Sequence, residues 1–390
     1  MRVLITGNAG YVGPVLVQHL RREYPSWHLT GLDSGFFWNA LSGSSAVPER
    51  LLDAQEFVDV RDVDSGVFSN VDAVIHLAAL SNDPLGNTYE QLTEDINLSA
   101  ATRVAALARD SGVTRFVFAS SCSMYGSSGA TARVETDELQ PLTAYARSKV
   151  AFEQSLKGMA SPGFSVTCLR FATACGVSSR TRMDLVLNDF VATAVTQGRV
   201  TVLSDGTPWR PLIDVHDMAR AVEWAVEDRL NHSCNFLAVN VGSSEWNFQV
   251  REIANRVADV VGGAALSFSD QAPADNRSYT VDFSRYRELA PYHQPTMTLE
   301  ESIRELVQHV ESDSRPERWS RPRVRPPHGR RGADRDGVHL AGHRAAAGRL
   351  DPGARLPGRA GRGAGHRRLL HRRQPARRPR LRGDRPEDPL

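Results

Sequence analysis

The chain has 390 residues and a formal net charge of only +2; 41% of its residues are hydrophobic and 24% charged, which allows about two or three packed globular units. No stretch approaches the roughly 18 consecutive apolar residues of a membrane-spanning helix, and the start, 1–7, is too short for a secretory signal, so we expect a cytoplasmic protein without membrane contact. The four cysteines have the spacing of neither a disulfide framework nor a zinc site, so we expect no bound metal.

Short apolar runs alternate with helical patterns over the first 170 residues. Strands that alternate with helices in this way pair in parallel through crossover helices. The pattern therefore predicts an α/β fold with a doubly wound parallel sheet of the Rossmann type. The predicted strands are 2–6, 27–32, 56–60, 73–77, 116–119 and 166–171, and the predicted helices include 89–110 and 144–159.

The alternation loosens after residue 171. One short strand, 200–203, stands among longer helical patterns, which predicts a smaller α/β lobe laid across the carboxyl ends of the first strands. We therefore expect a cofactor-binding domain with the catalytic residues at 1–170, and mainly a substrate-binding lobe at 171–312. The predicted helices of this lobe are 184–197, 215–228, 249–261 and 299–310.

A glycine-rich turn separates the first predicted strand from the first helix. In the pattern Gly7-x-x-Gly10-x-x-Gly13 the first glycine permits a tight turn, the second lets the backbone approach a pyrophosphate, and the third brings helix against strand. Asp33 ends the next strand, where a carboxylate binds the adenosine ribose and repels a 2′-phosphate, so NAD is predicted rather than NADP. The alternative for Asp33 is an ordinary turn residue. The predicted cofactor contacts are Gly7, Gly10, Tyr11, Val12, Gly13 and Asp33.

A serine, a tyrosine and a lysine form the second chemical signal. Ser121 follows a strand, and Tyr145 and Lys149 lie four residues apart on one face of a helix that Thr143 can cap. The ammonium group and the positive nicotinamide ring would stabilise a phenolate and lower its pKa from about 10. Tyr145 would then take a proton from a sugar hydroxyl as hydride leaves the same carbon, while Ser121 orients the oxygen and Lys149 also holds the cofactor ribose. The alternative is a solvated helix face, although a chance match is rare in a chain with two lysines.

Together with the segments 59–62 (Asp-Val-Arg-Asp), 76–79 (His-Leu-Ala-Ala) and 120–126 (Ser-Ser-Cys-Ser-Met-Tyr-Gly), these motifs carry a family resemblance over residues 1–312. The chain resembles the extended short-chain dehydrogenase/reductases, in particular the NAD-dependent sugar-nucleotide epimerases and dehydratases, of which UDP-glucose 4-epimerase is the best-known kind. The resemblance implies a homodimer. It also implies that Asp59 and Val60 flank the adenine, that Leu77, Ala78 and Ala79 line the cofactor diphosphate and ribose, and that Asn97 supports the nicotinamide side.

The same resemblance implies a nucleotide-diphosphate sugar as substrate. Arg210 and Arg277 match two family arginines and would bind the diphosphate, since a planar guanidinium pairs with two phosphate oxygens; the alternative is a surface arginine without a role. Cys122 and Ser123 replace the Asp-Glu pair of the family's dehydratases, which disfavours dehydration, and Thr173 replaces a family Asn, which indicates a subgroup with its own substrate. The implied substrate contacts are Ser121, Ser123, Thr173, Arg210 and Arg277.

The main functional hypothesis is an NAD-dependent nucleotide-sugar epimerase. Tyr145 would remove the C4 hydroxyl proton, NAD would take the C4 hydride, and the 4-keto sugar would turn over before hydride returns to its other face. Two alternatives stay open. A nucleotide 4-ketosugar reductase of deoxysugar biosynthesis would use the same residues and consume reduced cofactor. A non-catalytic nucleotide-binding regulatory protein would keep the fold alone, and the intact Ser121, Tyr145 and Lys149 argue against it.

The end of the chain, 313–390, differs in composition from the body. Residues 315–390 hold 22 arginines, seven acidic residues, ten prolines and eleven glycines, so too little apolar surface is present to offset chain entropy and we expect disorder. One explanation is a basic arm for a polyanion, but it lacks the interleaved aromatic residues of a nucleic-acid platform. We favour an out-of-frame reading of a GC-rich gene, because Arg, Gly, Pro and Ala have GC-rich codons. No nucleic-acid partner is expected.

Overall fold

Seven parallel strands form the central sheet of the computed structural model, which describes residues 1–42, 47–81, 88–127, 131–227, 235–269 and 277–313. The strand order is β10-β6-β5-β4-β1-β2-β3, and each neighbouring pair is parallel. This confirms the predicted doubly wound sheet of the Rossmann type. The strands are β1 (Arg2–Thr6), β2 (His28–Asp33), β3 (Ala54–Phe57), β4 (Ala73–His76), β5 (Arg115–Ser121), β6 (Ser165–Phe171) and β10 (Phe236–Val241).

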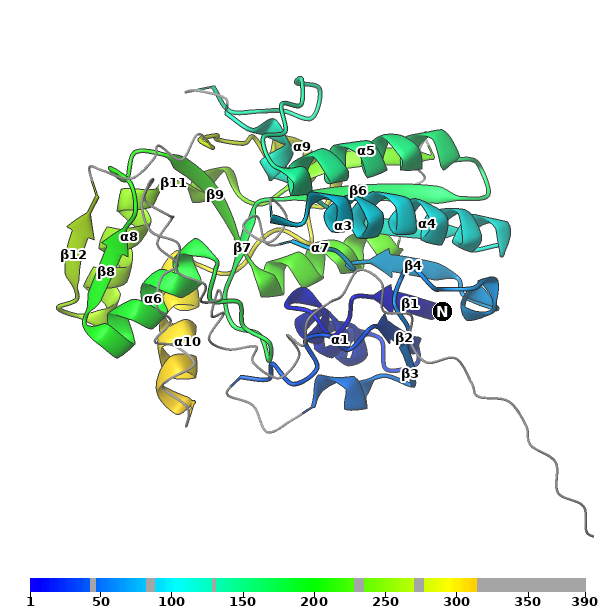
Figure 1. The fold of residues 1–390 in the computed structure, drawn as a ribbon, viewed down its shortest axis with the longest axis horizontal. Coiled ribbons are helices and arrows are strands. Elements are labelled where there is room, and N and C mark those ends of the chain that lie inside the picture. Colours follow the sequence, from blue (N-terminus) through cyan, green and yellow to red (C-terminus); the bar gives the residue numbers. More distant parts are fainter. Residues whose placement is uncertain (43–46, 82–87, 128–130, 228–234, 270–276, 314–390) are drawn as a thin grey trace, which may run out of the picture. The chain divides into compact units, whose positions relative to one another are not determined.

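Helices cover both faces of this sheet, because each strand sends alternate side chains to opposite faces. Val3 and Ile5 of β1 belong to the core shared with α1 and α7, whereas Leu4 belongs to the core shared with α4 and α5. Figure 1 shows α3, α4 and α5 running together along one face. The covering helices are α1 (Val12–Glu23), α3 (Glu90–Glu94), α4 (Ala101–Asp110), α5 (Ala144–Met159) and α7 (Val215–Glu227), with the π-helical segment η3 (Asp95–Ala100) joining α3 to α4.

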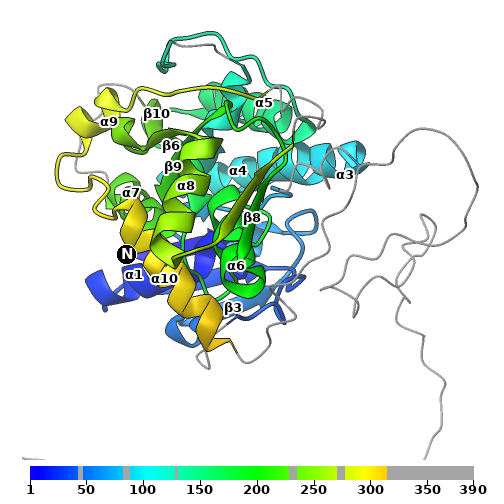
Figure 2. The same cartoon turned by 90° about the vertical axis from the view of Figure 1, so that its left-hand side faces the viewer.

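A second lobe has its own sheet and core. Strand β9 lies between β7 and β11 in a three-stranded sheet, and β8 pairs in parallel with β12. Side chains of α6, α8 and α10 form the core beneath these strands, and Figure 2 shows the three helices grouped beside β8. The elements are β7 (Thr173–Cys175), α6 (Val186–Gln197), β8 (Arg199–Val202), β9 (Trp209–Asp214), β11 (Asn247–Gln249), α8 (Val250–Val261), β12 (Ala265–Phe268) and α10 (Leu299–Ser312).

The chain passes between the two lobes more than once. After β7 and β9 of the second lobe, α7 packs against α1 on the first sheet, and β10 extends that sheet beside β6. Helix α9 (Ser284–Leu289) packs against β10, and its Tyr286 belongs to the core of the first lobe. Three elements of the first lobe, α7, β10 and α9, therefore lie beyond the expected boundary after residue 170. Short 3-10 turns complete the connections: η1 (Pro48–Leu51), η2 (Ser65–Phe68), η4 (Cys122–Tyr125) and η5 (Ser244–Trp246).

Two expectations concern the whole chain. Within the described ranges, every helix is too short or too polar to cross a membrane. The arginine-rich end, for which disorder or an out-of-frame origin is expected, lies outside the described residues after Asp313.

A buried ion pair joins α5 to β6 beneath the carboxyl end of the sheet. Arg170 Nη2 lies 2.7 Å from Glu153 Oε1, and both side chains are less than a tenth exposed. The other oxygen, Glu153 Oε2, accepts the Ser120 hydroxyl at 3.0 Å, and Arg170 also donates to the Tyr125 hydroxyl at 3.0 Å. Because each buried charge has its partner and further hydrogen bonds, the pair holds the helix of Tyr145 and Lys149 against the strand ends.

Glu153→Gln is expected to lower the free energy of unfolding by roughly 3 kcal/mol, because it leaves the Arg170 charge buried without a counter-charge. Urea unfolding followed by circular dichroism measures the change. Glu90→Gln is the matched control: Glu90 pairs with Arg147 at 3.1 Å, but both side chains are more than half exposed. An exposed pair contributes about 0–1 kcal/mol. Equal losses of unfolding free energy in Glu153→Gln and Glu90→Gln would show that burial does not strengthen the Arg170–Glu153 pair.

Candidate active site

The glycine-rich turn joins β1 to α1 and lies against the loop that follows β4. Gly7 has a φ of +74°, and its N–H donates to the Leu32 carbonyl at 2.8 Å. A Cβ at Gly7 would come within 2.6 Å of Ala78 N, and one at Gly13 within 2.1 Å of Asn8 O, so neither position accepts a side chain. A Cβ at Gly10 would meet only the Gly7 carbonyl oxygen within 4 Å, at 3.2 Å. The turn is therefore closed on the protein side at Gly7 and Gly13 and open at Gly10.

Asp33 ends β2 beside this turn. Its carboxylate accepts the Gly35 N–H at 2.8 Å and the Ala9 N–H at 3.2 Å. Burial is the largest influence and raises the pKa of Asp33, while these two N–H groups act in the opposite direction. The backbone contacts hold the carboxylate at the carboxyl edge of the sheet, next to the glycine turn.

Tyr11 and Val12 are oriented differently from the glycines. The Tyr11 hydroxyl donates to the Gly176 carbonyl at 2.7 Å, and the Tyr11 carbonyl accepts the Ser178 hydroxyl at 2.6 Å. The Tyr11 side chain thus ties the turn to the second lobe, and only its backbone faces the turn. Val12 is the first residue of α1 and is half-buried.

The segments implied for the adenine and the diphosphate follow β3 and β4. Asp59 forms an ion pair with Arg61 at 2.8 Å. Hydrogen bonding to this guanidinium lowers the pKa of the Asp59 carboxyl. Val60 is buried in the core shared with α4 and α5. Leu77, Ala78 and Ala79 are half-buried after β4. The Ala78 backbone faces Gly7, so this loop and the glycine turn form one edge.

Asn97, on the π-helical segment, connects that loop to α5. Its carboxamide accepts the Leu80 N–H at 2.8 Å, donates to the Leu80 carbonyl at 3.0 Å and donates to the Ser148 hydroxyl at 3.2 Å. Ser148 in turn donates to the Tyr145 carbonyl at 2.7 Å. Asn97 is buried, so these contacts place the loop relative to the helix that carries Tyr145 and Lys149.

Tyr145 and Lys149 lie in the first turns of α5, whose first turn is capped as predicted. The Thr143 hydroxyl accepts the Ala146 N–H at 3.1 Å. Lys149 is 3% exposed; its ammonium donates to the Ala119 carbonyl of β5 at 2.7 Å and lies 5.4 Å from the centre of the Tyr145 ring. Burial lowers the pKa of Lys149 to about 7. The lysine therefore holds a titratable cation between β5 and the half-buried phenol of Tyr145.

Ser121 ends β5 and caps the short turn η4. Its hydroxyl accepts the Ser123 N–H at 3.2 Å and donates to the Ser123 hydroxyl at 2.9 Å, so the two predicted serines form one polar edge. Cys122 between them is fully buried; its thiol donates to the Arg170 carbonyl at 3.0 Å, and burial raises its pKa. A buried, protonated thiol acts as a small packing group rather than a nucleophile.

The predicted substrate residues of the second lobe gather around a tyrosine that sequence reasoning missed. Thr173 of β7, Arg210 and Arg277 all lie close enough to the buried Tyr279 phenol to lower its pKa, although burial raises that pKa more strongly. The Arg210 guanidinium donates to the carbonyls of Trp209, at 2.7 Å, and of Arg277. The interaction of Tyr279 with Cys122 places this group beside the Ser121 turn.

Arg182 is a second residue that the sequence did not indicate. Its guanidinium donates to the Ser81 hydroxyl at 2.9 Å, in the loop after β4, and to Asp184 Oδ1 at 3.0 Å. It also interacts electrostatically with the phenols of Tyr145 and Tyr11. Arg182 thus connects the second lobe to the edge formed by the glycine turn. Its only sequence signal is the spacing Arg182-x-Asp184, which is too common to single out.

Lys149→Met is expected to change how stability depends on pH in nucleotide-free protein. The folded-state pKa of about 7 lies below the unfolded value of 10.5, so the buried ammonium destabilises the fold below pH 7, and this penalty shrinks between pH 7 and 10.5. As the pH rises over that range, the free energy of unfolding of the wild type should therefore increase relative to that of Lys149→Met by at most about 1.4 kcal/mol per pH unit. Urea unfolding at pH 6.5, 8 and 9.5 measures the difference.

The other lysine of the chain is the control for that experiment. Lys157 lies on the same helix but is exposed, so Lys157→Met should follow the wild type at every pH. If the free energy of unfolding varied with pH in the same way in the wild type and in Lys149→Met, Lys149 would not have a lowered pKa in the folded protein.

Comparisons with known proteins agree with this geometry. The model of the NAD dependent epimerase/dehydratase family matches residues 3–242. A UDP-glucose 4-epimerase of Streptomyces lividans is 30% identical over 282 residues, which are 67% of this chain and 81% of the relative. A UDP-glucose epimerase of Bacillus subtilis, itself uncharacterized, is 25% identical over 80% of this chain and 98% of its own length.

A solved structure shares the fold. MoeE5 in complex with UDP-glucose and NAD superposes with a TM-score of 0.68 at 24% identity, over 80% of this chain and 99% of its own. The predicted fold, enzyme class and cofactor are thereby confirmed, because the family match covers both the glycine turn and the Tyr145–Lys149 helix. The chain belongs to the NAD-dependent epimerase/dehydratase family, and its cofactor is NAD.

Proposed function

We propose that this enzyme is a nucleotide-sugar 4-epimerase that works through a transient 4-keto sugar. The observation that carries the proposal is the buried Lys149 ammonium, 5.4 Å from the Tyr145 ring and bonded to β5 two residues before Ser121. A cation at this distance favours the phenolate form of the tyrosine. A phenolate, a hydroxyl and a dinucleotide turn on one sheet edge are the groups that reversible oxidation of a sugar alcohol needs.

The residues present fit NAD. The glycine turn is open at Gly10, where a pyrophosphate can approach the backbone and the start of α1. Asp33 beside it offers carboxylate oxygens to ribose hydroxyls, and its charge disfavours a 2′-phosphate. We assign the adenine side to Asp59 and Val60, the diphosphate and ribose to Leu77, Ala78 and Ala79, and the positioning of the loop after β4 to Asn97.

The protein's own part in the chemistry is to move and hold one proton. Bound NAD supplies the hydride acceptor and later the hydride donor. Tyr145 takes the C4 hydroxyl proton as the C4–H bond breaks, and Ser121 donates a hydrogen bond to the same oxygen. Lys149 keeps the tyrosine pKa low in the forward step. Once the keto sugar has presented its other face, Tyr145 returns the proton to the C4 oxygen, so no cofactor is consumed.

The second lobe would bind the nucleotide diphosphate. Arg210 and Arg277 supply cations, and Thr173 lies near the same Tyr279 phenol that both arginines influence. Ser123, paired with Ser121, would contact the sugar. The substrate class is supported by a relative named UDP-glucose 4-epimerase and by a neighbouring structure that holds UDP-glucose and NAD. The homodimer implied by the family resemblance and the cytoplasmic location stay predictions.

Tyr145→Phe is expected to lower the turnover of a nucleotide sugar by about 10²–10⁴-fold, because it removes the proton acceptor, while NAD affinity changes little. Isomer formation from UDP-, dTDP-, GDP- and CDP-sugars, followed by chromatography, measures it. Tyr89→Phe is the control, since Tyr89 is 55% exposed. Unchanged turnover in Tyr145→Phe would remove the basis of the proposal.

The same assay separates epimerase from 4-ketosugar reductase. With wild-type protein and no added cofactor, an epimerase forms isomer without a net change in absorbance at about 340 nm, since hydride returns in each cycle. Stoichiometric loss of added NADH with a keto sugar would instead establish the reductase.

Gly7→Ala is expected to reduce NAD affinity at least tenfold, because its Cβ would lie 2.6 Å from Ala78 N and its φ of +74° disfavours a side chain. Isothermal titration with NAD measures the affinity, and circular dichroism checks the fold. Gly158→Ala, in α5 with nothing within 4 Å of a new Cβ, should bind NAD normally and gain up to ~1 kcal/mol of stability. Full NAD affinity in Gly7→Ala would place the cofactor elsewhere.

A further inference from the structure

A polar cavity of about 290 Å³ lies apart from the NAD edge, where α1 and α7 meet the segment between α9 and α10. Its wall includes carboxylates from α7 and histidines from α1 and from the segment after α9. Neither lobe's part of the proposed reaction uses these residues, and α5, with Tyr145 and Lys149, covers the other face of the sheet. The cavity therefore needs an explanation of its own.

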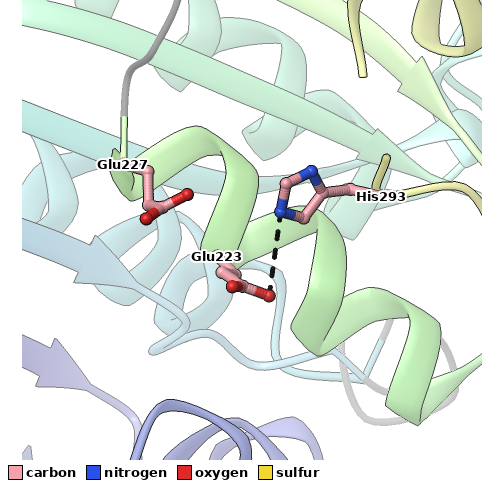
Figure 3. A group of neighbouring side chains, drawn as sticks. All are labelled: Glu223, Glu227 and His293. Atoms are coloured by element: carbon pink, nitrogen blue, oxygen red, sulfur yellow. Dashed lines mark ion pairs between the residues drawn. The ribbon is translucent and has the colours of Figure 1, made fainter. Parts of the chain in front are cut away.

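Three side chains converge in it, as Figure 3 shows: Glu223 and Glu227 from α7, and His293. The two glutamates are four residues apart and so project from one face of the helix. One donor atom from each of the three residues lies within 4.8 Å of the others. We propose that Glu223, Glu227 and His293 bind a divalent transition-metal ion such as Zn²⁺.

His293 and Glu223 form a long ion pair, and with Glu227 their donor atoms lie close enough together to be drawn onto one metal ion. His293 Nε2 is 3.9 Å from Glu223 Oε2. This is longer than a hydrogen bond, for which about 2.7–3.2 Å is usual. Two ligand atoms that bind one tetrahedral zinc ion at about 2.0–2.2 Å lie about 3.4 Å apart, so a bound ion would draw these two donors slightly closer together. Imidazole nitrogen with carboxylate oxygen is a ligand set suited to zinc and its neighbours in the first transition row.

The Glu223 carboxylate is also held in place from outside the ligand set. The Tyr24 hydroxyl donates to its Oε1 at 2.8 Å, and His19 Nε2 lies 2.6 Å from its Oε2. Arg22 Nη2 lies 3.1 Å from His19 Nδ1, and because a guanidinium only donates, Nδ1 accepts and Nε2 carries the proton. His19 is therefore a donor to Glu223 and not a ligand, which is the arrangement of outer groups that orient a metal-binding carboxylate.

The ligands come from elements that are distant in sequence but adjacent in space. Bound metal would join α7 to the segment that leads into α10 and, through His19 and Tyr24, to α1. It would also relieve the repulsion between two carboxylates one helical turn apart. The role that follows is structural: the ion stabilises the packing of α1 and α7 on the sheet and takes no part in hydride transfer.

The test uses the full chain, treated with EDTA and then dialysed. Isothermal titration with ZnCl₂ should show one saturable site, and the melting temperature should rise by several degrees, since a ligand that binds only the folded state stabilises it. Glu227→Gln and His293→Asn should each weaken zinc binding at least tenfold and abolish the thermal shift. Glu288→Gln, an exposed carboxylate of α9 outside the cavity, should behave like the wild type.

Three results would overturn the site. One is the absence of saturable binding of Zn²⁺, Mn²⁺ or Ca²⁺ by the wild type. Another is zinc binding that survives in both Glu227→Gln and His293→Asn, which would place it on other histidines or cysteines. The last is a loss of stability in His293→Asn that is equal with and without zinc, which would make the cluster an ion pair alone. Epimerase activity, measured separately, decides none of these.

Discussion

A lysine ammonium buried against β5 is the constraint around which the catalytic edge is built. Lys149 has one carbonyl partner, Ala119, and the faces of two aromatic rings, which is little compensation for lost hydration, and its pKa falls accordingly. Such a position persists only if the helix and strand cannot separate. The ion pair of Arg170 with Glu153 supplies that rigidity from the same helix, and Asn97 fixes the helix to the loop after β4.

The parallel sheet explains why residues so distant in sequence meet at one edge. All seven strands point the same way, so the turns after β1, β2, β4 and β5 open on one side, where α/β proteins bind their ligands. Contacts that hold the second lobe against that edge include Tyr11 with Gly176 and Ser178, and Arg182 with Ser81. These contacts lie next to the residues assigned above to the cofactor and to the proposed proton transfer, so the packing of the second lobe also positions the proposed site.

Thr173 and Cys122 are two of the positions at which this chain departs from the family pattern, and the structure shows what surrounds each of them. Thr173 stands in place of the family's Asn, and Thr173, Arg210 and Arg277 all lie close enough to the Tyr279 phenol to influence its pKa. Cys122 is fully buried and its thiol donates to the Arg170 carbonyl, so this position supplies no exposed acid.

Local patterns were enough to predict the parallel sheet, the glycine turn, the capped helix of Tyr145 and Lys149, and hence the family and its cofactor, because each is a short-range signal of period or spacing. Strands β7, β9, β10 and β12 escaped because runs of three to six residues are too short to carry a clear alternation. Val58–Val60, expected as strand, leaves the sheet after Phe57. Only the tertiary structure could join Tyr279 to Thr173, Arg182 to Ser81 and His293 to Glu223. These pairs are separated by 70 or more residues. Local conformational preferences do not determine which distant segments pack together in the folded chain.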